Sequence, residues 1–506
     1  MKNRVLSFLA SAALIVSLVP AVAVAGAGSV ATPSLVLGPK AVLASVSGPS
    51  YSLFSCQVGL STGVCYDPYQ MRHAYGIDSL ISAGYTGRGK TIIIVDSFQA
   101  PNIVSQLNTF DTFYGLAGLN GLGNPYDPTL GKFTQIAPDG LTPFDASNDD
   151  QVGWAEEISL DVEWAHSIAP GANIVLDLAK SDQDPDLLSA TQYAVRHNLG
   201  DVISQSFGEN ESCVDPKVLS AEHQMYADAT RKGMTIFASS GDEGAAQLTC
   251  DGNSWVKAAS SPASDPLVTG VGGTELTAAD YCLTSLGCDP TTSPAAGTYK
   301  SEVAWNEGPP FGDFQDEFDS TLASGGGFSL LYRTPAYQLG TVRGKQRGVA
   351  DVSYSAAVLH GVLTYLDIPG IPAGFYRFGG TSAGSPQWAA IIAIADQKAH
   401  GDLGFINAAL YRLGQSPYTY AASFHDVTSG NNSSMQFDAN NNAVTVTGFN
   451  AGRGWDAPTG LGTPTGTQLV NRLIQLVRSD DGPGAIGGSD PDGSGNHGGP
   501  GHNRPH

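Results

Sequence analysis

The chain has 506 residues and a formal net charge of −22, and only 14% of its residues are charged. The 25 Lys and Arg residues, against 47 Asp and Glu, provide no basic stripe for neutralising phosphates, so we exclude nucleic acid as a partner. Few basic residues also mean few ion pairs that acid would break, which is compatible with an acidic working environment.

Residues 1–25 have the features of a secretory signal peptide. Lys2 and Arg4 precede a largely apolar stretch, residues 5–19, and Ala23-Val24-Ala25 is typical of a signal-peptidase site. No later run is long and apolar enough to cross a bilayer. We therefore expect a secreted, extracellular protein that does not bind a membrane.

The composition divides the rest of the chain into three parts. Residues 26–66 are rich in Ala, Val, Ser and Gly and are too few to build a substantial core. Residues 67–478 alternate apolar and polar stretches and predict one large domain. Residues 479–506 are rich in Gly, Asp and His and lack an apolar pattern, so we expect a disordered tail and not a metal site.

The six cysteines fall into three pairs that are close in sequence. None has the Cys-x-x-Cys spacing of a metal site, and disulfides are expected in an exported chain. The sequence does not fix the connectivity. The local pairing would be Cys56–Cys65, Cys213–Cys250 and Cys282–Cys288.

Continuous β-branched runs alternate with helical patterns along the domain. This alternation predicts an α/β fold with a parallel sheet and helices on both faces. The loops at the carboxyl ends of such strands usually carry the functional site. The predicted strands lie within 89–97, 172–179, 200–208 and 234–244, and a helix over 187–200 is expected to end in a capping Gly200.

The segment 154–170 predicts a helix with two acids on its apolar face. Glu157 and Asp161 are four residues apart, so they lie on the same face as Trp154 and Ile158. Buried neighbouring acids repel each other and share protons, which raises at least one pKa and makes a usable base. The alternative is a rotated helix on which both acids reach solvent. The opposite, solvated face would hold Glu156, Ser159, Glu163 and Ser167.

The stretch 379–397, GGTSAGSPQWAAIIAIADQ, places a serine before an apolar helix. Pro386 suits the first helical turn, and the backbone N–H groups there favour negative charge beside Ser382. Ser382 is therefore a candidate nucleophile. The alternative is an ordinary N-cap serine.

Four stretches, in this order, together resemble the sedolisins, the serine-carboxyl peptidases that share the subtilisin-like fold. The resemblance covers about residues 68–475 and implies a single catalytic domain with a subtilisin-like parallel sheet. The four stretches are Glu157-Ile-Ser-Leu-Asp161, Ser240-Gly-Asp242-Glu-Gly244, Gly380-Thr-Ser382-Ala-Gly-Ser-Pro386, and His425-Asp-Val-Thr428 with Gly452-Arg-Gly-Trp-Asp456.

This resemblance implies the catalytic roles. Ser382 attacks the peptide carbonyl, and Glu157 is the general base that later protonates the leaving amine. Asp161 holds and tunes Glu157, while a protonated Asp242 donates to the oxyanion. Asp96, at the end of a predicted strand, is a candidate to support this group.

The resemblance also implies a substrate cleft and one structural Ca²⁺. Peptides or unfolded proteins would pair with backbone at two segments, Ser206-Phe207-Gly208 and Ser324-Gly325-Gly326. Oxygen ligands, some from glycine-permitted backbone, suit calcium. The expected calcium ligands are Asp426, Val427, Gly452, Gly454 and Asp456.

The predicted activity is that of a monomeric, acid-active endopeptidase, and three alternatives remain open. One is a tripeptidyl-peptidase of the same family. Another is a Ser-His-Asp hydrolase, for which His360 and His425 are the nearest candidates. The third is a catalytically dead binding protein on the same scaffold. The sedolisins usually carry a domain-sized prosegment, whereas about forty residues follow the predicted cleavage site here.

Overall fold

The computed structural model describes residues 30–47, 51–61, 63–308 and 320–480. The predicted signal peptide, and all but two residues of the predicted tail, lie outside these ranges. The two exceptions, Ser479 and Asp480, end helix α10.

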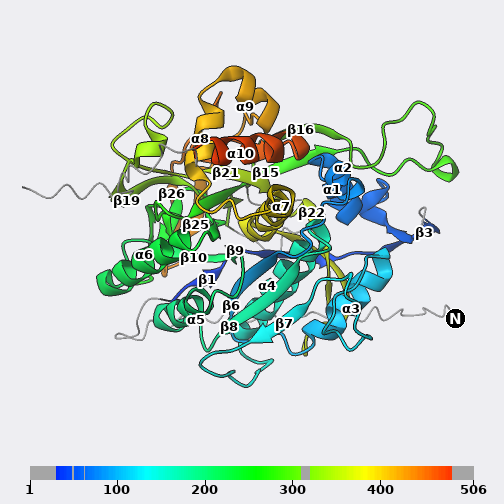
Figure 1. Cartoon of the computed structure of the whole chain (residues 1–506), viewed down its shortest axis with the longest axis horizontal. Coiled ribbons are helices and arrows are strands. Elements are labelled where there is room, and N and C mark those ends of the chain that lie inside the picture. Colours follow the sequence, from blue (N-terminus) through cyan, green and yellow to red (C-terminus); the bar gives the residue numbers. More distant parts are fainter. Residues whose placement is uncertain (1–29, 48–50, 62, 309–319, 481–506) are drawn as a thin grey trace, which may run out of the picture.

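A central eight-stranded sheet organises the chain (Figure 1). Its strands are parallel apart from the edge strand β16, which is antiparallel to β15. The predicted α/β class is therefore confirmed. The order is β16 (Tyr299–Ala304), β15 (Thr269–Ala278), β11 (Thr235–Ser239), β9 (Val202–Gln205), β6 (Thr91–Ser97), β8 (Asn173–Ala179) and β7 (Phe133–Ile136), with β21 (Val352–Ser355) also paired to β15.

Helices cover both faces of this sheet, as the alternation in β6 shows. Ile92 and Ile94 belong to the core that includes α4 (Asp149–Ile168) and α7 (Ser385–Ala399). Ile93 and Val95 belong to a separate core with α5 (Asp184–His197) and α6 (Pro216–Arg231). Since successive strand residues point to opposite faces, α4 and α7 lie on one face and α5 and α6 on the other.

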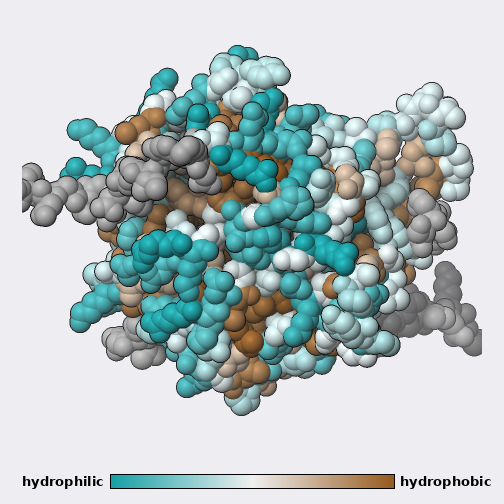
Figure 2. Space-filling view, in the orientation of Figure 1, coloured by the Kyte–Doolittle hydropathy of each residue, from teal (hydrophilic) through white to brown (hydrophobic). Residues whose placement is uncertain are grey.

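The remaining helices pack around this frame. Hydrophilic side chains cover much of the face seen in Figure 2, as expected for helices whose apolar sides turn inward. None of the helices in the described ranges is long and apolar enough to span a membrane. The helices that pack around the frame are α1 (Pro68–Ala74), α2 (Asp78–Ser82), α3 (Ile103–Tyr114), α8 (Asn407–Gly414), α9 (Pro417–Ser423) and α10 (Thr467–Asp480).

The segment before residue 67 packs into the same body. Strand β2 (Val36–Lys40) pairs with β23 (Gly374–Gly379), and β5 (Val64–Tyr66) pairs with β22 (His360–Leu366), in a four-stranded sheet. Phe54, Cys56 and Cys65 contribute to a small core with residues of α3 and β23. The segment therefore forms no core of its own but extends that of the domain.

The three expected disulfides are confirmed, and no cysteine of the described chain is free. Each closes a local loop, so each restrains mainly the unfolded chain. The bonds are Cys56–Cys65, Cys213–Cys250 and Cys282–Cys288.

Two local predictions are wrong. Helix α5 ends at His197 and is capped by the left-handed Asn198 (φ 52°), not by Gly200. Asparagine tolerates this conformation, which ends the helix two residues earlier than glycine would. The run 200–208 is also two strands, β9 and β10 (Phe207–Asn210), separated at Ser206.

The predicted solvated face of the 154–170 helix is wrong as well. Helix α4 lies between the main sheet, α3, α7 and β22, so its whole circumference is covered. Two of the polar groups find partners, since Glu163 accepts the N–H of Tyr365 at 2.8 Å and Ser159 donates to the carbonyl of Ala155 at 2.8 Å, whereas the Ser167 hydroxyl has no partner among the described residues. The buried residues of this face are Glu156, Ser159, Glu163 and Ser167.

Candidate active site

Ser382 lies in a tight turn between β23 and α7. Gly380, with φ of +100°, turns the chain into a short 3₁₀ segment, η5 (Thr381–Ala383), and Pro386 stands in the first turn of α7. The N-cap of α7 is Gly384, so the N-cap alternative for Ser382 does not hold. The side chain of Ser382 is fully buried and available for another role.

That role is a hydrogen bond to Glu157. The Ser382 hydroxyl lies 3.0 Å from Glu157 Oε2 and 3.1 Å from the carbonyl oxygen of Ser206. Helices α4 and α7 pack against each other, which brings together two residues 225 positions apart. A hydroxyl within hydrogen-bond reach of a buried carboxylate is the arrangement of an activated nucleophile.

Asp161 lies one turn further along α4 and contacts the same carboxyl group. Its Oδ1 accepts the Ser206 hydroxyl at 2.9 Å, and its carboxyl group is hydrogen-bonded to that of Glu157. Among the described residues, no N–H or hydroxyl reaches Glu157 Oε1 or Asp161 Oδ2. Two carboxyl groups can bond to each other only through a proton, so this contact requires one of the two groups to be protonated.

Asp96 completes a cluster of three buried acids. It is the last residue but one of β6, on the face toward α4, and neither of its oxygens has a partner within the described part of the chain. Burial raises the pKa of Asp96 well above its usual range, and repulsion from Asp161 adds to this effect. Burial also raises the pKa of Glu157 well above its usual range, with further repulsion from Asp161 and Asp96, and raises that of Asp161 to about 7.

Asp242 approaches the serine turn from the other side. It follows β11, and its Oδ1 accepts both the N–H of Thr381 at 2.7 Å and the Thr381 hydroxyl at 2.8 Å. Its Oδ2 has no partner among the described residues and borders the space beside Gly380. Burial raises the pKa of Asp242 well above its usual range, Glu243 adds repulsion, and the two bonds from Thr381 oppose the shift.

Several known proteins are similar to this chain over most of its length. Kumamolisin of Bacillus sp. (strain MN-32) is 30% identical over 406 residues, covering 74% of this chain and 64% of kumamolisin. Sedolisin of Pseudomonas sp. (strain 101) is 32% identical over 410 residues, covering 79% of this chain and 60% of sedolisin. A solved structure of Pseudomonas sedolisin, a serine-carboxyl proteinase complexed with two molecules of pseudo-iodotyrostatin, superposes with a TM-score of 0.63 at 28% identity and covers 83% of this chain and 100% of that one.

The chain is similar to the sedolisins over most of its length. No protein-family model matches it. The chain spans less than two thirds of the length of the two curated sedolisin-family relatives described above.

One of the two segments expected to bind substrate is paired with the chain's own N-terminal segment. Strand β1 (Thr32–Pro33) runs antiparallel to β10, with Thr32 opposite Gly208 and Pro33 opposite Phe207. Figure 1 shows β1 beside β10. Sequence reasoning missed this contact, because a short Ala/Ser-rich stretch carries no signal of where it docks.

The other expected segment lies behind the Asp242 turn. The N–H of Gly325 donates to the Gly241 carbonyl at 2.7 Å, and Ser240 donates to the Gly325 carbonyl at 2.9 Å. Ser324 bonds to Gly273 and to Pro458, and Gly326 adopts a φ of +145° that favours glycine. These contacts hold the turn that carries Asp242.

The expected calcium residues lie in two segments that meet, 426–427 and 452–456. The N–H of Gly454 donates to Asp426 Oδ1 at 3.0 Å, and the N–H of Gly452 donates to Asp456 Oδ2 at 2.8 Å. Val427 follows Asp426 and is buried. The two carboxylates therefore face the same glycine-rich turn.

The two candidate histidines bond elsewhere. His360 Nδ1 lies 2.7 Å from the carbonyl oxygen of Leu276, and the ring of His425 stacks on Tyr299 at 3.9 Å between centroids. The Ser382 hydroxyl reaches a carboxylate instead. The geometry thus favours a serine-carboxyl group over a Ser-His-Asp triad.

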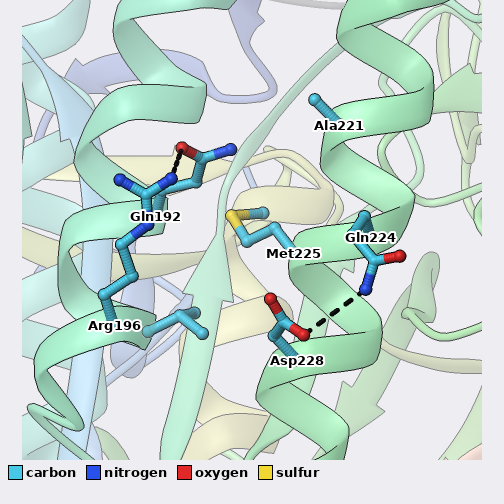
Figure 3. Close-up of a pocket in the computed structure, with 7 residues that line it drawn as sticks. Gln192, Arg196, Ala221, Gln224, Met225 and Asp228 are labelled. Carbon is cyan, nitrogen blue, oxygen red and sulfur yellow. Dashed lines mark hydrogen bonds between the residues drawn. The ribbon is translucent and has the colours of Figure 1, made fainter.

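A surface pocket of about 170 Å³ lies between α5 and α6 (Figure 3). Met225 points into it, and two hydrogen bonds within single helices, Gln192 with Arg196 and Gln224 with Asp228, border it. Both helices cover the face of the sheet opposite α4 and α7. The pocket is therefore separate from the catalytic groups.

The many buried acids predict that the fold is most stable in acid. Asp177 is an example away from Ser382, because burial raises its pKa to about 8. The folded chain then binds more protons than the unfolded chain, so the free energy of unfolding decreases as the pH rises from about 4 to about 8. Asp177→Asn is expected to raise the urea midpoint at pH 8 more than at pH 4.

The matched control is an aspartate whose pKa is shifted in the opposite direction. A hydrogen bond from Thr249 lowers the pKa of the exposed Asp251 to about 2. Its stabilising effect is present above the unfolded pKa and is lost in acid, so Asp251→Asn is expected to destabilise the chain at pH 8 and not at pH 2. Equal changes at both pH values for the two variants would contradict the assignment.

Proposed function

We propose that this chain is a secreted, acid-active serine endopeptidase that hydrolyses peptides or unfolded proteins. The observation that carries the proposal is the 3.0 Å contact between the Ser382 hydroxyl and Glu157, with Asp242 on the other side of the same turn. Three disulfides support an oxidising compartment such as the extracellular space. We expect a monomer that needs no nucleic acid or membrane partner.

In the proposed reaction, the Ser382 oxygen bonds to the substrate carbonyl carbon, and Glu157 takes the proton of the Ser382 hydroxyl. Asp161 accepts a bond from Ser206 and shares a proton with Glu157, which fixes the orientation of the base. Glu157 then protonates the leaving amine, and the acyl-enzyme forms. The oxygen of a water molecule next bonds to the acyl carbon as Glu157 takes its proton, and Glu157 returns that proton to the Ser382 oxygen as the acid product leaves.

The oxyanion would form between the N–H of Ser382 and Asp242 Oδ2. Thr381 makes two donations to Oδ1, so a proton on Asp242 would be carried by Oδ2, which faces the space beside Gly380. A neutral acid donates a hydrogen bond to the oxyanion, whereas a carboxylate would repel it.

We favour endopeptidase over tripeptidyl-peptidase activity because the cleft holds a chain longer than three residues. Residues 30–34 all lie along it, from the bridge between Val30 and Gln183 to the bond between Ser34 N–H and the Ser206 carbonyl at 3.1 Å. The N–H of Ala31 donates to the Asp182 carbonyl at 3.1 Å. A site that removes tripeptides needs an obstacle beyond the third substrate residue on the N-terminal side of the cut. In this chain, residues 30 and 31 continue along the cleft beyond that point.

The test is digestion of a denatured protein from pH 2 to 8 by the purified chain, with Ser382→Ala as the blank. We expect internal fragments with acid-side activity that the blank lacks. A ladder of tripeptides would indicate the exopeptidase. No cleavage at any pH would indicate a binding protein on a catalytically dead scaffold.

We also propose one structural Ca²⁺ at the loop that contains Asp426, Val427, Gly452, Gly454 and Asp456. The fit rests on two carboxylates that face one turn and on the open space beside two glycines of that turn. Carboxylate and carbonyl oxygens are the ligands that calcium prefers.

Calcium that binds only the folded chain would add stability by mass action. We expect a chelator to lower the unfolding temperature by on the order of 5 °C. Asp456→Ala is expected to lower the unfolding temperature by a similar amount, and a chelator is then expected to have no further effect. Asp438→Ala, in another aspartate-containing turn, is the control that keeps the chelator effect. Metal analysis that finds no calcium, together with no chelator effect, would contradict the site.

A further inference from the structure

A second acid, Glu243, directly follows Asp242 on the turn after β11. Its backbone is held on both sides by Ala323 of β18 (Leu322–Ala323), to which residue 243 is bridged. The N–H of Ala323 donates to the Asp242 carbonyl at 2.7 Å, and the N–H of Gly244 donates to the Ala323 carbonyl at 2.9 Å. The position of Glu243 relative to Asp242 is therefore set by the fold.

The carboxyl group of Glu243 turns back toward Asp242. Its Oε2 accepts the N–H of Asp242 at 3.2 Å. A Cβ built on Gly241 would lie 3.8 Å from the same oxygen, so this carboxyl group lies against the turn that presents Asp242. Asp242 is buried, and Glu243 is partly buried. A charge on Glu243 is therefore poorly screened from its neighbour.

No cation offsets this charge in the described part of the chain. Neither Asp242 nor Glu243 forms an ion pair there with Lys, Arg or His. The other acids of the site, Glu157 and Asp161, lie on the far side of Ser382. The remaining groups that border the Asp242–Glu243 turn are uncharged: the side chains of Thr381, Gln247, Ser260 and Ser434, and the backbone of Ser34, Ala323 and Asn432.

Of the two neighbouring acids, Asp242 is the one that keeps its proton. Burial raises the pKa of Asp242 well above its usual range, and repulsion from Glu243 raises it further. Burial also raises the pKa of Glu243, but the N–H groups of Asp242 and of Glu243 itself oppose that rise. Glu243 therefore ionises first as the pH rises, and its charge then disfavours ionisation of Asp242.

We propose that Glu243 is a positioning residue for the proposed reaction: its carboxylate keeps the proton on Asp242 and so extends activity to a higher pH than Asp242 would reach without it. This proposal rests on the proposed peptidase activity. Glu243 acts through Asp242 and forms no bond to the reacting atoms in this role. At a pH low enough to protonate both acids, Glu243 is uncharged and is expected to have no effect.

The experiment compares kcat/KM from pH 2 to 8 for wild type, Glu243→Gln and Glu243→Asp, on a peptide without charged side chains. Glutamine keeps an acceptor for the Asp242 N–H but removes the charge. The basic limb of Glu243→Gln is expected to move to lower pH by on the order of one unit. This shift makes kcat/KM about tenfold lower on the falling limb and leaves the acid limb unchanged. Glu243→Asp keeps the charge and is expected to hold the limb near its wild-type position.

Two controls show whether the effect passes through Asp242. Glu307 is a buried glutamate that accepts the Trp305 indole N–H at 2.8 Å and the Leu359 N–H at 2.7 Å, and Glu307→Gln is expected to keep the wild-type limb. In an Asp242→Asn chain, which has no Asp242 proton to lose, Glu243→Gln is expected to leave the limb in place. A limb that still moves in that chain overturns the proposal, because Glu243 would then act on another group.

Failure of this proposal can be distinguished from failure of the proposed function. If Asp242→Asn extends activity to higher pH but Glu243→Gln keeps the wild-type limb, or lowers activity equally at every pH, the role of Glu243 alone is overturned. An inert wild type, or an Asp242→Asn profile with the wild-type limb, overturns the protonated Asp242 and this proposal together.

A direct titration provides a readout that does not depend on activity. The ¹³C signal of the Asp242 carboxyl group, assigned by its loss in Asp242→Asn, is followed from pH 2 to 8 in a Ser382→Ala chain. Adding Glu243→Gln is expected to lower the titration midpoint by the same amount as the limb, and an unchanged midpoint overturns the proposal. Near-ultraviolet circular dichroism and the unfolding temperature check folding; if the glutamine variant does not fold, Glu243→Ala removes the same charge with a smaller side chain.

Discussion

Glu157→Gln and Ser382→Ala are each expected to lower kcat/KM for peptide hydrolysis by at least about 10³-fold in a chain that still folds. Glutamine keeps the shape of Glu157 and a hydrogen-bonding group beside Ser382, but it cannot take the serine proton. Alanine removes the oxygen that would bond to the substrate. Both positions are buried, so the loss of activity must be measured beside the unfolding temperature.

The chain offers matched controls for both substitutions. Glu163 is another buried glutamate of α4, and it accepts a backbone N–H from Tyr365 at 2.8 Å. Ser385 lies three residues after Ser382 and bonds to the Ser204 hydroxyl at 2.8 Å. Glu163→Gln and Ser385→Ala are expected to retain activity wherever they fold. A Glu157→Gln chain with near-normal turnover would place the general base elsewhere.

The double variant separates a catalytic pair from two independent losses. Residues that act as a unit lose activity non-additively, so Glu157→Gln with Ser382→Ala is expected to be little worse than either single variant. Multiplied losses would mean that the two side chains act in separate steps.

The sequence predicted well what depends on local spacing. The spacing of four positions from Glu157 to Asp161 places both on one face of a helix in any fold, and the apolar run after Pro386 predicts a buried helix. The β-branched runs likewise became β6, β8, β9 and β11. These features need no knowledge of what packs against them.

Predictions that depend on the partner surface did less well. Glu163 and Ser159 were expected in water, but the β22–β23 sheet and α3 cover that side of α4, and a helical wheel contains no information about a second sheet. The docking of Ser34 against Ser382 is similar, since two segments 348 residues apart meet only in the folded chain. Thr381, which fixes Asp242, also had no separate signal beyond its place next to Ser382.

Asp242→Asn is expected to retain part of the acid activity and to extend activity to higher pH. Burial raises the pKa of Asp242 well above its usual range, and Glu243 adds repulsion. The protonated donor is therefore present in acid and is lost as the pH rises through the apparent pKa of this group, which produces the basic limb of a bell-shaped profile. An asparagine amide does not lose a proton in this pH range, so its hydrogen-bond donor remains as the pH rises.

The geometry explains why asparagine can replace the acid here. Thr381 donates twice to Oδ1, so the asparagine carbonyl keeps both bonds and its NH₂ group takes the place of Oδ2 beside Gly380. Loss of an oxyanion donor costs about 10²–10³-fold in kcat, which sets the largest drop expected in acid for a poorly placed amide. The measurement is kcat/KM from pH 2 to 8 for both proteins, with Asp242→Ala as the variant that has no donor at any pH. A wild type that is most active above pH 7, or an Asp242→Asn profile with the wild-type basic limb, would show that a protonated Asp242 does not limit the reaction, and the basic limb would then belong to the coupled Glu157 and Asp161 pair.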